Sequence, residues 1–100
     1  MKADLRRLAE GRYSLEGEVT VDTVPDLWPL IQQAAAQPGV ACLSCKGVTQ
    51  ADSAAVAVII EWMRLLHRRG GTLMVEDLPM EMQMIIEISD LEDVFHIEVA

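Results

Sequence analysis

The chain of 100 residues has few aromatic side chains, since Trp, Tyr and Phe together make up only 4% of it. A core without them must be built from aliphatic residues, and hydrophobic residues reach 51% of the chain. That share excludes intrinsic disorder, and the length allows only one core. We therefore predict a single domain over residues 1–100.

Positive charge is also scarce: 8 Lys and Arg residues stand against 16 Asp and Glu residues, which gives a net charge of −8. Such a chain is repelled by nucleic-acid phosphates and by anionic membrane surfaces. The only basic run, His67-Arg68-Arg69, follows a predicted helix, where cations offset the negative end of the helix dipole. We expect no nucleic-acid partner.

Long apolar runs are missing too. No stretch reaches the about 18 apolar residues of a membrane span, and the N-terminus has no signal-peptide pattern. We expect a cytoplasmic protein without direct membrane insertion.

Cysteine occurs only twice, as Cys42 and Cys45 in the sequence VACLSC. The spacing is that of a zinc or redox motif, but no second pair and no nearby His completes a metal site. Residues three apart on a strand also point to opposite faces, which opposes a disulfide. We interpret both as buried thiols of a strand, and expect no metal and no cofactor.

Hydrophobic periodicity predicts the order β-β-α-β-α-β-α. A hairpin turns at Glu10-Gly11 and ends near Val19. The next elements are a helix that starts at Asp22 or Thr23 and stops at Pro38-Gly39, a strand over 40–48, a helix over 53–69, a strand over 72–78 and a helix from Pro79. A short turn and a last extended segment complete the chain. We predict an α/β domain with a mixed, mostly parallel sheet, in which the strand over 40–48 is covered on both faces.

The helix over 53–69 shows an unusual outer face. A step of 100° per residue places Ala55, Ile59, Trp62, Met63 and Leu66 towards the core. Ser53, Ala54 and Ala57 then lie on the outer face, with Val58 at its margin. These small uncharged residues either let a neighbouring strand approach closely or form a docking surface for a partner.

The last helix carries a second apolar excess, because Met80 and Met84 lie outside if Met82, Ile85 and either Ile86 or Ile88 face the core. The two methionines fill gaps in the core or form an adaptable binding stripe, and gap-filling is the favoured interpretation.

We find no enzyme site in the sequence. Asp52, Ser53 and a histidine could be drawn as a catalytic triad, but His67 lies about 20 Å along the same helix at 1.5 Å per residue. His96 has no motif around it. The Arg69-Gly70-Gly71 stretch follows a helix, whereas a phosphate-binding loop precedes one.

The sequence from VACLSCKGVTQADSAAVAVIIEW to MIIEISDLEDVF resembles the STAS domain family. Its motif is a buried strand, a loop, and an Asp-Ser or Asp-Thr pair with small residues that opens a helix. Asp52 and Ser53 match the pair, and Ala54 and Ala55 match the small residues. The resemblance implies a STAS fold and a non-catalytic binding module.

Two branches of that family remain open. In the anti-sigma factor antagonists the serine that matches Ser53 is phosphorylated by a partner kinase, although Ser44 and Ala55 differ from the acidic residue and the glycine common there. The small subunit of the Mla phospholipid ABC transporter is more similar, and includes a tryptophan that matches Trp28. That branch implies binding to the cytoplasmic ATPase, with which Trp28 and Ser53 would make contact.

The helical spacing and the family resemblance point to the same surface. We predict partner binding through Trp28, Ser53, Ala54, Ala57 and Val58, with Ser53 also serving as the side-chain cap of its helix. Phosphorylation of Ser53 is the alternative. Through a transporter complex the chain would lie at the inner membrane.

Overall fold

A computed structural model describes residues 2–96 of the chain. The elements follow the predicted order: β1 (Asp4–Ala9), β2 (Arg12–Val19), α1 (Val24–Ala35), β3 (Val40–Ala51), α2 (Ser53–His67), β4 (Thr72–Glu76), α3 (Met80–Ile88) and α4 (Glu92–Phe95). None of the helices in this range is long and apolar enough to cross a membrane.

The four strands lie in the sheet in their sequence order, β1-β2-β3-β4. β1 and β2 form the predicted antiparallel hairpin, whose turn places Gly11 at a φ of 71°, a value that favours glycine. β2, β3 and β4 are parallel neighbours. The mixed, mostly parallel sheet of the STAS-like fold is therefore confirmed.

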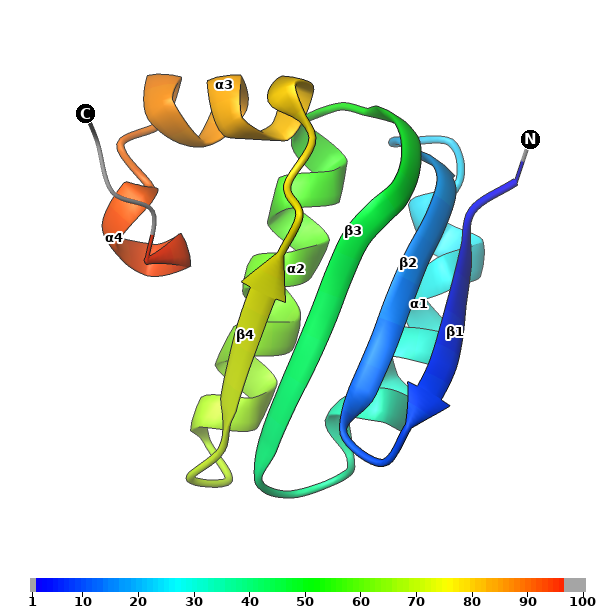
Figure 1. Cartoon of the computed structure of the whole chain (residues 1–100), viewed down its shortest axis with the longest axis vertical. Helices are drawn as coiled ribbons and strands as arrows, with labels where there is room; N and C mark the ends of the chain where they lie inside the picture. The colour runs from blue at the N-terminus through cyan, green and yellow to red at the C-terminus, as the bar shows by residue number, and fades with distance from the viewer. Residues whose placement is uncertain (1, 97–100) are drawn as a thin grey trace.

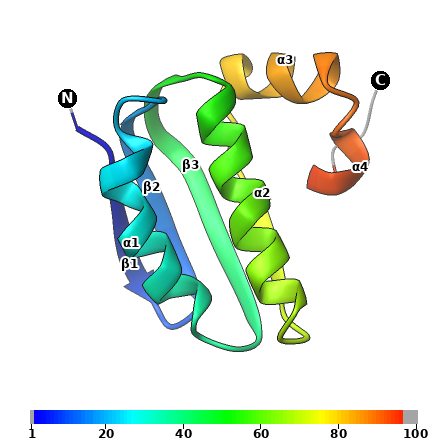
Figure 2. The ribbon, with the colours of Figure 1, turned by 180° about the vertical axis from the view of Figure 1, so that it is seen from behind.

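Both long helices cover the same face of the sheet. Figure 1 shows the sheet in front of α1 and α2, and the opposite view in Figure 2 shows these two helices in front of it. The core lies between, where alternate residues of β2 and β3 meet the inner stripes of the helices. Its largest fully buried member, Trp62 of α2, meets Tyr13 of β2 edge to face, with ring centroids 5.4 Å apart.

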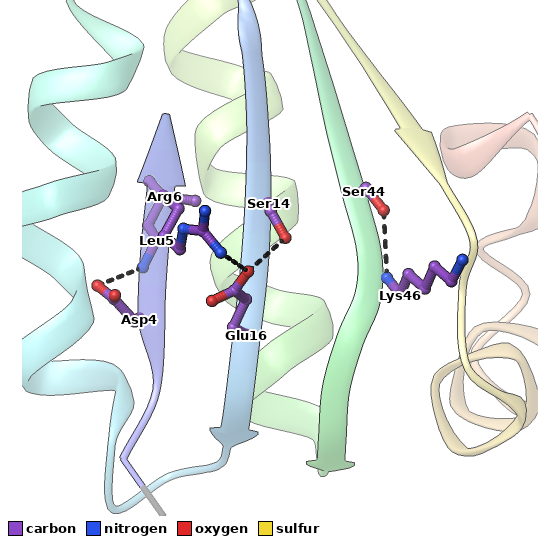
Figure 3. Close-up of polar contacts among 7 residues, drawn as sticks. All are labelled: Asp4, Leu5, Arg6, Ser14, Glu16, Ser44 and Lys46. Carbon is purple, nitrogen blue, oxygen red and sulfur yellow. Dashed lines mark hydrogen bonds and ion pairs between the residues drawn. The ribbon is translucent and has the colours of Figure 1, made fainter. Parts of the chain in front are cut away.

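The prediction that β3 is covered on both faces is wrong. Only every second side chain from Ala41 to Cys45 is buried, because in the described part of the chain both long helices pack on one face of the sheet and neither packs on the other. That face is polar, as Figure 3 shows: Glu16 accepts hydrogen bonds from Arg6 at 3.2 Å and from Ser14 at 3.0 Å. The predicted burial of both thiols is therefore wrong for Cys42, which is half-buried, and right for Cys45.

Two boundaries also differ. β3 continues to Ala51, because Gln50 and Ala51 still pair with Glu18 and Val19 of β2. α2 ends at His67 instead of Arg69. β4 is an edge strand with one buried residue, Leu73, so its predicted burial holds for one face only.

α3 and α4 close one end of the molecule, and α3 runs across the top of α2 in Figure 1. Met82 and Ile86 are its buried residues, while Ile88 is 81% exposed, so a core role for Ile88 is wrong. Met80 and Met84 do face outwards, at 69% and 53% exposed, which contradicts gap-filling. The short turn is α4, and the predicted last extended segment falls on residues outside the described range.

Candidate partner-binding surface

The first turns of α1 and α2 lie at the same edge of the sheet. They meet there because β2 and β3 are parallel neighbours, and each leads directly into its helix. The backbone N–H of Val21, in the loop before α1, donates a hydrogen bond of 3.0 Å to Oδ2 of Asp52, before α2. The two helix starts are thus joined by one carboxylate, at the upper ends of α1 and α2 in Figure 2.

Asp52, and not Ser53, caps α2. The backbone of Asp52 is extended, and its Oδ1 accepts a hydrogen bond of 2.8 Å from the backbone N–H of Ala54. This is the ordinary N-cap geometry, in which a carboxylate also suits the positive end of the helix dipole. Ser53 is the first helical residue, so the prediction that its side chain caps the helix is wrong.

The Ser53 side chain is exposed, and within residues 2–96 it makes no hydrogen bond. Its hydroxyl is therefore available to a partner or to a modifying enzyme.

Between the two helix starts lies a shallow, almost wholly apolar hollow of about 270 Å³. Its lining consists of Val24, Trp28, Ala54, Ala57, Val58 and Glu61. Four of the five residues predicted for partner binding are brought together here. Ser53 lies outside the lining, immediately before Ala54.

The small residues of α2 explain why the hollow exists. Ala54 and Ala57 carry only a methyl group each, so they do not fill the space beside the half-buried Trp28 of α1. Val58, predicted at the margin of the outer face, is only 5% exposed and contributes an edge of the hollow. The other interpretation of the alanines, close approach of a strand, fails because this side of α2 faces α1 and solvent.

Sequence reasoning missed two residues of the lining, Val24 and Glu61. Helical spacing could have found both, because Val24 precedes Trp28 by four residues and Glu61 follows Ala57 by four. Arg64 donates hydrogen bonds to both carboxylate oxygens of Glu61, and this bonding lowers the pKa of that carboxyl. Glu61 therefore keeps a negative charge at the rim of the hollow.

The residues of a conceivable triad are not assembled. His67 ends the helix that Ser53 begins, and His96 follows α4. Burial and, to a lesser extent, the nearby Asp77 raise the pKa of Cys45 to about 12, so this thiol is not a nucleophile at neutral pH. In residues 2–96 no group of His, Cys, Asp and Glu side chains is arranged to hold a metal ion.

Comparison with known proteins now places this geometry. No curated protein sequence matches the chain. The structure is similar to the anti-sigma factor antagonist SpoIIAA in its unphosphorylated form, with a TM-score of 0.65 and 17% identity over 86% of this chain and 82% of that one. It is also similar to a part of Mglu, with a TM-score of 0.56 and 19% identity over 77% of this chain and 20% of that one.

At these identities the two likenesses show the fold alone. The family itself follows from the sequence, because the family described as "Mlab, STAS domain" matches residues 5–98. The chain belongs to the STAS domain family, in its MlaB type.

Proposed function

We propose that this chain is a non-catalytic accessory subunit that binds the cytoplasmic ATPase of a phospholipid-transporting ABC complex of the Mla type. The observation that carries the proposal is the match to the MlaB-type family over residues 5–98. The hollow between α1 and α2 supports it, since an apolar, approachable surface with its one charge, Glu61, at the rim suits the centre of an interface. The chain would then work in the cytoplasm, at the inner membrane through its complex.

The hollow combines one large aromatic side chain with small residues around it. Trp28 presents a large, half-buried aromatic surface, of the kind that often carries most of the energy of an interface. Ala54 and Ala57 allow the partner's backbone to come close, and Ser53 adds a hydroxyl at the edge. Binding would raise the rate of ATP hydrolysis only to the extent that the chain binds the active conformation of the ATPase more tightly than the other conformations.

Purification of the tagged chain from its own cells tests the proposal. We expect the ATPase to co-purify and its rate of hydrolysis to fall when the chain is removed. Recovery of an anti-sigma factor kinase without any transporter ATPase would contradict the proposal.

Trp28→Ala tests the surface itself. Loss of a central aromatic anchor costs about 2 kcal/mol or more, which weakens binding by about 30-fold. Met84→Ala, which removes an exposed apolar side chain of α3 outside the hollow, is the matched control and should bind normally. Affinity is measured by titration against the isolated ATPase. Equal losses in both variants would rule out the hollow as the contact.

The second candidate is an anti-sigma factor antagonist that phosphorylation of Ser53 switches. The fold shared with SpoIIAA and the exposed hydroxyl of Ser53 favour it. A phosphate on the first residue of α2 would be compatible with the helix dipole but would place a double charge beside an apolar contact.

Intact mass of the chain from growing and from stressed cells separates the two candidates. A phosphorylated fraction that Ser53→Ala abolishes supports the switch. Its absence in both conditions, together with ATPase recovery, supports the accessory subunit. Ser53→Asp should weaken ATPase binding while the neutral Ser53→Asn does so less, because only the first brings a charge into the interface.

A further inference from the structure

Two further hollows lie on the other side of α1, between its C-terminal half and the hairpin of β1 and β2. Their volumes are about 250 Å³ and 290 Å³. They adjoin, because Arg7, Tyr13, Ala34 and Gln37 line both. Neither includes any residue of the apolar hollow described above.

The register of the hairpin explains how a cation and a phenol come together here. Arg7 of β1 pairs directly with Tyr13 of β2, so their side chains lie on the same face of the sheet. Tyr13 belongs to the buried series of β2, and that face is the one α1 covers. Arg7 is therefore on the helix side of the sheet, where an apolar residue would ordinarily be expected.

Tyr13 contributes a polar group that has no partner. The side chain is only 6% exposed, and within residues 2–96 its hydroxyl makes no hydrogen bond. What remains accessible of it opens into the two hollows, which it lines. The hydroxyl oxygen itself is not among the fully buried, unpartnered polar atoms of the described chain, so it can be reached from the hollows and can donate a hydrogen bond to a ligand there.

Arg7 differs from the other arginines of the sheet. Arg6 pairs with Glu16 and Arg12 pairs with Glu76, whereas Arg7 forms no ion pair within the described part of the chain. In a molecule with twice as many acidic as basic residues, a strand arginine without a carboxylate partner is unexpected. Its fork of five donors is suited to carboxylate or phosphate oxygens.

The residues that line the first hollow indicate the sign of the charge on the ligand. Besides Arg7 and Tyr13 it contains the amides of Gln33 and Gln37, and among residues 2–96 no acidic side chain lines it. Its remaining lining is apolar: Leu5, Leu30 and Ala34. An anionic head with an apolar body fits this combination.

The second hollow restricts the ligand to one anionic head. It includes Glu10, which the first hollow lacks, while the C-terminal turn of α1, whose carbonyls give a negative potential, lines both hollows. A second anion would be repelled there, while Pro38, Val40 and Ala41 offer apolar contact. The body of the ligand therefore extends past Ala34 into this second hollow.

We infer that the cleft between α1 and the β1–β2 hairpin binds a small amphipathic ligand with a single anionic head group, with that carboxylate or phosphate on Arg7 and Tyr13 and its short apolar body over Ala34. The inference does not depend on the proposed function, because it uses a different surface.

Titration with hexanoate, acetate, hexyl phosphate and hexanol at constant ionic strength tests the inference, with amide chemical shifts as the readout. We expect saturable hexanoate binding in the millimolar range, with shifts at Ala34 and Gln37, and at least about tenfold weaker binding of acetate and hexanol. Hexyl phosphate shows which head the site prefers, and a preference for either head is consistent with the inference.

Arg7→Gln and Tyr13→Phe test the two head-group contacts. Arg7→Gln should weaken hexanoate binding at least about tenfold, and Tyr13→Phe by about threefold to tenfold, as expected for a charged and a neutral hydrogen bond. Arg68→Gln removes the same charge from the end of α2, outside both hollows, and should leave binding unchanged. Tyr13→Phe keeps the aromatic contact with Trp62, so it should remain folded.

Three results would overturn the inference. The first is no saturable binding of hexanoate or hexyl phosphate at tens of millimolar. The second is hexanol binding as tightly as hexanoate, which would make the site merely apolar. The third is an equal loss in Arg7→Gln and Arg68→Gln, which would reduce the effect to net charge.

Discussion

Asp52 is the single residue that most directly organises the proposed interface. One of its oxygens caps α2 through Ala54 N–H, and the other holds the loop before α1 through Val21 N–H. In the Asp-Ser pair at the start of α2, the aspartate therefore has the structural role, and the serine side chain remains available to a partner.

Asp52→Ala should lower the free energy of unfolding by about 1–2 kcal/mol, because it removes the cap and leaves the second N–H without its partner. Asp52→Asn keeps one oxygen for the cap but turns its amide NH2 towards the N–H of Val21, so it should lower the free energy of unfolding by less than Asp52→Ala does, but still measurably. Ser53→Ala should stay within about 0.5 kcal/mol of the wild type, since its side chain makes no contact that stabilises the fold. Urea unfolding of the three variants measures these differences. A larger loss in the free energy of unfolding for Ser53→Ala than for Asp52→Ala would show that Ser53, and not Asp52, caps α2.

At the scale of secondary-structure elements, periodicity identified the four strands and the three longer helices of the described chain, predicted α4 only as a turn, and did not show which faces the helices cover. The strands follow one another across the sheet in sequence order. Two right-handed crossovers that advance in the same direction must place α1 and α2 on the same face. A reversal of strand order would have covered both faces, and the apolar pattern of VACLSC alone does not distinguish these cases.

The residues of the candidate surface could also be predicted from the sequence only in part. Ala54 and Ala57 follow from the helical period of α2 alone, whereas Trp28 came only from the family resemblance. Helical spacing also places Val24 beside Trp28 and Glu61 beside Ala57, but that these two helix faces meet in one hollow depends on α1 lying beside α2, which no local pattern encodes.

α3 gives the sharpest test at this scale, because its isoleucines are chemically equal and differ only in position. Ile86 is completely buried, whereas Ile88 is 81% exposed. Ile86→Ala should cost about 2–5 kcal/mol, as for other buried large-to-small changes, and Ile88→Ala about 0.5 kcal/mol or less. Urea unfolding of the two variants measures the difference. Similar costs would mean that α3 is rotated about its axis relative to this structure.

At the scale of the whole molecule, a single hydrophobic core joins the sheet to α1, α2 and α4. Leu15 and Leu43 of the sheet, Ile31 of α1 and Trp62 of α2 belong to it, and so does Phe95 of α4. The Cα radius of gyration is 12.4 Å, near the about 13 Å expected of a single domain of 100 residues. A division into two independently stable parts would have to cut through this cluster.

Unfolding should therefore be a single cooperative transition. Trp28→Phe leaves Trp62 as the only indole, and Trp62 lies at the centre of the core against Tyr13. Its fluorescence in urea then reports tertiary packing, while far-ultraviolet circular dichroism reports the helices and strands. We expect the two midpoints to coincide, since small domains with one core unfold as a unit. Loss of the Trp62 signal at lower urea than the dichroism would show that helices persist after the core has opened, and would contradict a single cooperative transition.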